Sequence, residues 1–299
     1  EGFRPRSQTP DHESIHAVSD RTLGPVLING VAHDASAASV SVFDIGFQRG
    51  YGCFEAMRVY GGTAFRLDDH LDRLDRSAEH LRIGLPPRAD LRAWCTTVAA
   101  QGAPTGGGVL RVYVTGGTDP KHPGTDNRIV AFLEPLPDVP PSVRLDVLDA
   151  PWHADGRSSE LTGAKTLSYG PNLAATIAAR SRGFDDAALV GDDDVVLEGP
   201  TFSLGWVTDG TICTPALDSH ILASITREAA IEVARKLDIS VREERFLRED
   251  LLAADEVFVM STVREILPAV AVGDRTLDPG PITAALRNGF HELVAAETR

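Results

Sequence analysis

Lysine is scarce in this chain, so the side chains that could act as an amine nucleophile are few. The 299 residues contain only Lys121, Lys165 and Lys236. Lys165 lies in the segment Leu161–Tyr169, which is composed of small, apolar and hydroxyl-bearing residues and contains no acid to pair with the ammonium group. A partly desolvated, unpaired lysine favours the neutral amine, which is the nucleophilic form. The alternative is a lysine whose stem packs while its head remains in water.

Two further segments have residue types that suit a bound cation or anion. Glu198 follows the apolar run Val195–Leu197, and a carboxylate at the end of a buried strand needs a partner such as a protonated ring nitrogen. Ser224–Glu228 opens a predicted helix, and the N–H groups at such an end, with the Thr226 hydroxyl, suit a phosphate. A turn glutamate and an ordinary helix cap are the alternative explanations.

Two more candidates gain meaning only in combination with the first three. Arg73 projects from a predicted helix close to its apolar stripe, and Ser261 and Thr262 end an apolar run, a common place for ligand contacts. Taken singly, the arginine is explained by a surface ion pair and the hydroxyls by the end of a strand. None of these signals assigns a function by itself.

Two groups of elements must position these residues. In the first group, Asn29-Gly30 and Gly61-Gly62 are predicted hairpin turns between short strands. A helix is predicted from about Asp68, because apolar residues recur at helical spacing. Its buried stripe would consist of Leu71, Leu74, Ala78 and Leu81. A second helix is predicted over 89–100, and strands over 109–115 and 128–133.

Four prolines between Pro135 and Pro141 can continue neither a strand nor a helix, so this stretch is the predicted linker. Helices are predicted after it over 172–182, 226–237 and 281–296, and strands over 187–190, 203–207, 212–214, 240–246 and 256–260. The pattern predicts an α+β protein in two domains, over 21–136 and 143–299, joined by a linker at 137–142. Residues 1–20 are interpreted as a flexible tail.

The composition excludes several classes of function. The chain is 42% hydrophobic and carries 43 acidic against 29 basic residues, a net charge of -14, which disfavours nucleic acid and anionic membrane as partners. It has no apolar run of transmembrane length. Its cysteines, Cys53, Cys95 and Cys213, are far apart and form no metal-binding motif. We therefore expect a reduced, cytoplasmic protein without a metal site.

The order and spacing of several motifs carry a stronger signal than any one of them. From about residue 25 to residue 290 the chain resembles the class IV (fold type IV) aminotransferases, which depend on pyridoxal 5'-phosphate (PLP). The resemblance implies a small N-terminal α/β domain and a larger C-terminal pseudo-barrel domain that binds PLP. The stretches that carry it are Phe43–Glu55, Phe65–Leu74, Lys165–Leu173, Leu197–Gly199, Ile221–Arg227 and Ala254–Thr262.

The resemblance implies a role for each matching residue. Lys165 would carry PLP as an aldimine and move the proton between substrate Cα and cofactor C4′, through ketimine and pyridoxamine forms. Glu198 would keep the pyridine nitrogen protonated, so that the ring can accept the carbanion's electrons. The remaining implied cofactor contacts are Tyr169 near the ring and, around the phosphate, Arg73, the backbone amides of Ile225 and Thr226, and Thr262.

The resemblance also implies a homodimer, with a loop from the partner subunit closing over the site. The Arg-x-His element that holds the substrate carboxylate in familiar D-amino-acid enzymes is missing from Thr118–Pro123, where Lys121 and His122 could substitute. Arg49 and Arg111 stand where relatives tend to carry aromatic residues, and paired guanidinium groups suit a carboxylate. We expect these two arginines to form a carboxylate clamp, unless either pairs with a structural acid.

These features favour a transaminase that moves an amino group between a D-amino acid, or an (R)-amine, and a 2-oxo acid. A branched-chain L-amino-acid aminotransferase and an aminodeoxychorismate lyase are the alternatives within the family, and a cofactor-free binding protein is the alternative outside it. Ser203 and Ser224 are departures, because relatives often have asparagine and glycine at these positions. They bear on the substrate more than on the reaction.

Overall fold

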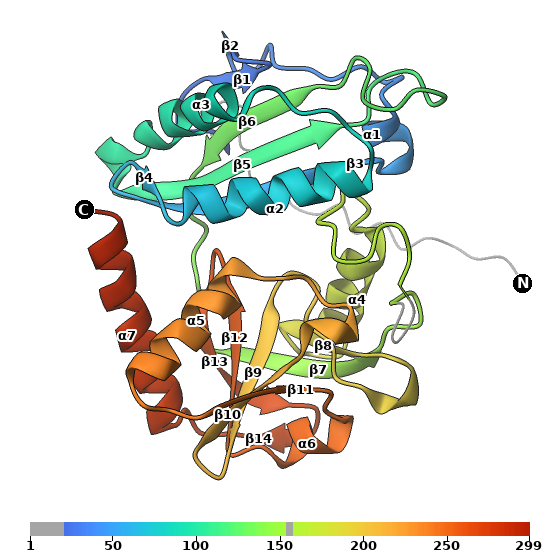
Figure 1. Cartoon of the computed structure of the whole chain (residues 1–299). Coiled ribbons are helices and arrows are strands. Elements are labelled where there is room, and N and C mark those ends of the chain that lie inside the picture. Colours follow the sequence, from blue (N-terminus) through green and yellow to red (C-terminus); the bar gives the residue numbers. More distant parts are fainter. Residues whose placement is uncertain (1–20, 154–157) are drawn as a thin grey trace, which may run out of the picture.

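The computed structural model describes residues 21–153 and 158–299, and the predicted tail lies outside them. The described residues form two β-sheets, of six and eight strands, each packed against helices (Figure 1). The prolines of residues 135–141 lie between the last strand of the first sheet and the first strand of the second. No helix in these two ranges is long and apolar enough to cross a membrane.

The first sheet has the strand order β2-β1-β6-β5-β3-β4. The two predicted hairpins are confirmed, with Asn29 and Gly30 at φ 48° and 80° and Gly61 and Gly62 at 56° and 98°. The strands are β1 (Val26–Ile28), β2 (Val31–His33), β3 (Gly52–Tyr60), β4 (Thr63–Ala64), β5 (Gly107–Thr115) and β6 (Ile129–Glu134), and the helices are α1 (Ile45–Arg49), α2 (Leu67–His80) and α3 (Arg88–Ala100).

Alternation along β3 and β5 gives this sheet two different faces. Cys53, Met57 and Val112 belong to a core with apolar residues of α2 and α3, and the predicted stripe Leu71, Leu74, Ala78 and Leu81 is no more than 2% exposed. Because successive strand side chains point to opposite faces, Phe54 and Tyr113 face away from the helices. This second face is turned toward the other sheet.

The second sheet has the order β11-β10-β9-β12-β13-β7-β8, and β14 pairs with β13. Helices α5 and α7 pack on β12, and α4 packs on β8. The strands are β7 (Val143–Asp149), β8 (Asp186–Val190), β9 (Ser203–Thr208), β10 (Thr211–Pro215), β11 (Val241–Glu244), β12 (Glu256–Ser261), β13 (Glu265–Val272) and β14 (Arg275–Thr276), and the helices are α4 (Gly170–Ser181), α5 (Ile225–Lys236), α6 (Arg248–Ala253) and α7 (Pro281–Glu297).

Some elements differ from the sequence pattern. Strands β7 and β13 were not expected, although β13 pairs with β12 along five residues. Pro268 within β13 argues against a strand locally, and only pairing with β12 and β7 decides the conformation. The strand expected over Val195–Leu197 is reduced to isolated bridges, Val190 with Val196 and Val195 with Leu247.

Candidate active site

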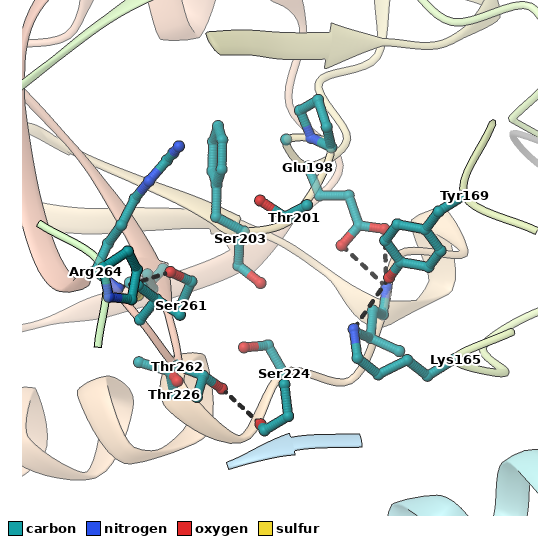
Figure 2. Close-up of a pocket in the computed structure, with 18 of the residues that line it drawn as sticks. Lys165, Tyr169, Glu198, Thr201, Ser203, Ser224, Thr226, Ser261, Thr262 and Arg264 are labelled. Carbon is teal, nitrogen blue, oxygen red and sulfur yellow. Dashed lines mark hydrogen bonds between the residues drawn. The ribbon is translucent and has the colours of Figure 1, made fainter. Parts of the chain in front are cut away.

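A cleft of about 870 Å³ lies between the two sheets (Figure 2). One wall is the helix-free face of β3 and β5, joined by the buried part of α2. The opposite wall consists of the segment Glu198–Ser203, the first residues of α5 and the segment Met260–Arg264. Residues from both halves of the chain therefore meet across one space.

Lys165 is the one lysine of the chain that lines this cleft. Its backbone is attached to the first sheet and to α2: its carbonyl accepts from Phe54 N at 3.0 Å, and its N–H donates to Ser77 Oγ at 3.0 Å. Its Nζ lies 3.0 Å from the Tyr169 hydroxyl and 4.4 Å from the centre of the Phe54 ring. The amine thus lies over the Phe54 ring, and the Tyr169 hydroxyl is its hydrogen-bond partner.

Glu198 is partly buried on the opposite wall of the cleft. Both of its carboxylate oxygens lie 3.3 Å from the backbone nitrogen of Leu222, and Oε1 lies 3.8 Å from His153 Nε2. Its own carbonyl accepts from Leu189 N, which ties the segment to β8. The carboxylate is held by the backbone but keeps the capacity to accept a further hydrogen bond.

The N-terminus of α5 opens into the same cleft. Ser224 caps the helix by accepting a hydrogen bond from Arg227 N at 3.3 Å, and the N–H groups of the next two residues need no intrahelical partner. Thr226 is buried, and Thr262, at the end of β12, donates to the Ala56 carbonyl at 3.0 Å. Figure 2 shows Ser224, Thr226 and Thr262 close together, all to the same side of Lys165.

Arg73 is 4% exposed and lines the cleft, so the alternative of a surface ion pair is wrong. Its guanidinium donates two 2.7 Å hydrogen bonds to Glu55 and one of 2.9 Å to the Ala223 carbonyl, next to Ser224. His70 Nδ1 lies 2.7 Å from the same Glu55 carboxylate. Glu55 ends one of the stretches that carry the family resemblance, but the sequence predicted no role for it, since no local pattern indicates an acid that faces a core.

The charges of this buried cluster determine its protonation. Burial by itself raises the pKa of Glu55, but the Arg73 charge and the hydrogen bonds from Arg73 and His70 lower it to about 2. Burial lowers the pKa of His70, and the nearby charges of Arg73 and Lys165 add to this, against the opposing effect of Glu55. At neutral pH, His70 is therefore neutral and Glu55 ionised, so Nδ1 of His70 carries the proton that it donates.

The two arginines of the expected clamp lie in different settings. Arg111 and Tyr113 both face the cleft, as strand alternation predicted. Arg111 Nε donates to Glu134 Oε2 at 2.7 Å, so the expected alternative, an ion pair with an acid, is present, but its terminal nitrogens have no hydrogen-bond partner among the described residues. Arg49 is exposed at the end of α1 and does not line the cleft of its own chain. Lys121 is also exposed and does not line the cleft.

Two cleft residues have contacts, or lack them, in a way that the sequence did not predict. Arg264 pairs with Asp186 at 2.7 Å and lies over the Phe202 ring. Ser203, where relatives often have asparagine, is buried at the cleft, and its hydroxyl has no partner in the described part of the chain. In both cases the partner or its absence depends on segments far away in sequence.

The donor set fits PLP. An amine on one wall, a carboxylate on the other and a group of N–H and hydroxyl donors at a helix N-terminus match an aldehyde, a pyridine nitrogen and a phosphate. Ser203 Oγ is an additional buried polar atom at this cleft, and it has no hydrogen-bond partner within residues 21–153 and 158–299. Among the residues outside the two undescribed segments, no group of three or more His, Cys, Asp or Glu is arranged to hold a metal ion.

Known proteins show which family this architecture represents. The family model of class IV aminotransferases matches residues 52–272. A D-alanine aminotransferase of Listeria innocua is 31% identical, over 90% of this chain and 96% of its own length. A branched-chain-amino-acid aminotransferase of Salmonella typhimurium is 30% identical, over 87% of this chain and 90% of its own.

A solved structure agrees with these sequence relationships. The fold IV transaminase from Curtobacterium pusillum superposes with a TM-score of 0.81 at 30% identity, covering 90% of this chain and 94% of that one. The enzymes of this family depend on PLP. The chain therefore belongs to the class IV aminotransferases, PLP-dependent enzymes of fold type IV that transfer amino groups between amino acids and 2-oxo acids.

Proposed function

We propose that this aminotransferase moves an amino group between a D-amino acid and a 2-oxo acid, using Lys165 as its catalytic base and cofactor-binding lysine. When bound, PLP supplies an electron sink for the charge that develops at the substrate Cα. The observation that carries the D-amino-acid proposal is Arg111, a cleft-lining arginine with unpartnered terminal nitrogens on the wall beside Lys165 and Tyr113.

Lys165 is suited to move a proton because its amine lies in the cleft and is oriented by two neighbouring side chains. The Tyr169 hydroxyl at 3.0 Å and the Phe54 ring at 4.4 Å orient Nζ, and no ion pair joins it to an acid of the described residues. With PLP bound, a single base that reaches both substrate Cα and cofactor C4′ could take the proton from the first carbon and return it to the second. In this proposal Lys165 holds that proton between the two transfers.

The remaining cofactor contacts follow from the two ends of the cleft. We assign Glu198 to the pyridine nitrogen, since among the described residues its carboxylate accepts only the backbone N–H of Leu222, with His153 Nε2 farther away at 3.8 Å. The phosphate is assigned to the Ile225 and Thr226 backbone amides, with Thr262 and the unused N–H groups of Arg73. Arg73 links the two walls, because it also donates to the Ala223 carbonyl beside this helix end.

A second subunit would complete the substrate site. Large apolar side chains are exposed near α1 and on α4: Phe43 69%, Phe47 74%, Leu173 60% and Ile177 58%. Figure 1 shows α1 and α4 on one side of the molecule, and Ser168 Oγ donates to the Gly50 carbonyl at 3.0 Å between them. Exposed apolar surface of this kind suits an interface. We propose a homodimer in which Arg49 of the partner subunit reaches this cleft and holds the substrate carboxylate with Arg111.

The first test of the substrate is a visible-absorbance titration of the PLP-loaded protein with D-alanine and, in parallel, L-leucine. The proposal expects D-alanine alone to remove the band of the lysine-bound cofactor. Loss with L-leucine alone would contradict it and favour branched-chain L-amino acids, which the Salmonella relative's name supports equally. If neither amino acid changes the band, D-amino-acid transfer is refuted and lyase or (R)-amine chemistry should be assayed next.

The clamp is tested by Arg111→Ala. Because a hydrogen-bonded charge pair contributes about 1.5–3 kcal/mol, we expect the KM for D-alanine to rise about ten-fold or more. Glu134→Gln is the matched control, since it removes the ion-pair partner of Arg111 but leaves the guanidinium in place. An unchanged KM in Arg111→Ala, with the same stability loss in both variants, would show that Arg111 is only structural. Size-exclusion chromatography with light scattering tests the dimer.

A further inference from the structure

The hydroxyl of Ser203 is a buried polar group without a protein partner. Ser203 is 2% exposed and begins β9, and its Oγ forms no hydrogen bond with any of the described residues. A buried hydroxyl that is left unpaired destabilises a fold, so such atoms in native proteins call for an explanation. Because Ser203 also lines the cleft, a bound ligand can supply the missing partner.

The pairing of β9 determines which way this hydroxyl faces. Leu204 and Trp206 pack in the core on one side of the sheet, whereas Val207 packs in a core with residues of α5 and α7. Since alternate residues of a strand share a face, Ser203 lies on the Val207 side, toward α5. Its cross-strand neighbour Met260 packs in the same α5 and α7 core.

The same part of the cleft contains the donors of an anion site. The α5 backbone N–H groups of Ile225 and Thr226 begin the helix, and Thr262 comes two residues after Met260, the partner of Ser203. Figure 2 shows the Ser203 hydroxyl pointing into the open centre of the cleft, on the side of Ser224 and Thr226. A helix N-terminus stabilises negative charge, and a buried hydroxyl that points toward it is a further donor.

We propose that Ser203 Oγ donates a hydrogen bond to the phosphate group of the bound cofactor. The unpaired hydroxyl then has its partner in the PLP-bound protein and lacks it only in the apoprotein. This assignment depends on the family's cofactor and not on the identity of the amino-acid substrate. A failure of the D-alanine experiment would therefore leave it standing.

The test is the affinity of the apoprotein for PLP and for pyridoxal, which lacks the phosphate, measured by absorbance and fluorescence titration. A hydrogen bond to a charged group corresponds to a loss of about ten-fold or more in affinity when the donor is removed. We expect Ser203→Ala to weaken PLP binding by that factor and to leave pyridoxal binding unchanged. Unchanged PLP affinity, or an equal loss for both ligands, would overturn the proposal.

A stability measurement separates this role from a structural one. Ser219 is a matched control, because it is 1% exposed, its Oγ is also unpartnered, and it does not line the cleft. Ser203→Ala and Ser219→Ala should both keep or raise the melting temperature of the apoprotein, and only Ser203→Ala should weaken PLP binding. A lower apoprotein melting temperature in Ser203→Ala would contradict the unpaired hydroxyl. Should that variant not fold, Ser203→Gly removes the donor without adding bulk, and wild-type PLP affinity in it would again overturn the assignment.

Discussion

Replacing Glu55 with glutamine should destabilise the protein more than the loss of any exposed acid. Glu55 is fully buried and accepts two 2.7 Å hydrogen bonds from Arg73 and one from His70. Glutamine has nearly the same volume but no charge, and its amide group would oppose the donors of Arg73. Removing one partner of a buried ion pair costs about 3–5 kcal/mol, because the other charge remains buried.

A second estimate comes from the protonation of Glu55. Its pKa is lowered from 4.5 to about 2, and a shift of this size corresponds to about 3 kcal/mol of stability. Because the folded-state pKa is the lower one, this contribution is complete above the unfolded pKa and is lost as the pH falls from about 4.5 toward 2. Both estimates predict a loss of at least about 3 kcal/mol at pH 7, or at least about 6 °C in melting temperature.

The assay is urea unfolding of the apoproteins, monitored by circular dichroism at several pH values between 7 and 3.5. The difference between wild type and Glu55→Gln should be constant above about pH 5.5 and should shrink below pH 4.5. Glu134→Gln is the control, because its 2.7 Å pair with Arg111 is partly exposed and should contribute less than about 1 kcal/mol. A loss in Glu55→Gln no larger than in the control, or one that persists unchanged at pH 3.5, would refute the reasoning.

Three further predictions concern the cleft and the buried thiols. Lys165→Ala should abolish the visible absorbance band of the PLP-loaded protein and lower the rate of transamination at least about 1,000-fold. Its circular dichroism spectrum should be unchanged, and a smaller loss of rate would show that another base acts. Glu198→Gln should lower kcat about 100-fold or more while the protein still binds PLP, which stopped-flow absorbance can measure, and a wild-type kcat would remove Glu198 from the pyridine nitrogen. Burial raises the pKa of both Cys53 and Cys95 to about 12, so neither should react with a disulfide reagent at pH 8 until urea unfolds the chain, and rapid labelling of either residue in the native protein would contradict its burial.

The family and the main elements could be predicted because they depend on local sequence patterns, which do not change with the packing of distant segments. Glycines at Gly30 and Gly61 allow the turns, and the spacing of Leu71 and its neighbours indicates a helix with one buried face. Because the chain has three lysines, the candidates for a reactive amine were few, and one of them, Lys165, lines the cleft. The order of several short motifs was enough to indicate a class IV aminotransferase, which the family comparison confirms.

The contacts that give these residues their chemistry were decided only by tertiary structure. Glu55 and Arg73 lie on a strand and a helix, and nothing in either segment shows that they share one buried ion pair. The pairing of Arg111 with Glu134 depends on the alignment of β5 and β6. The Ser203 hydroxyl is unpaired because no donor or acceptor of the described residues lies within hydrogen-bond distance of it. Periodicity reports which face of an element is buried, because that depends on a few adjacent residues. The partner of a buried polar group depends on how distant elements pack, and so it emerges only from the folded chain.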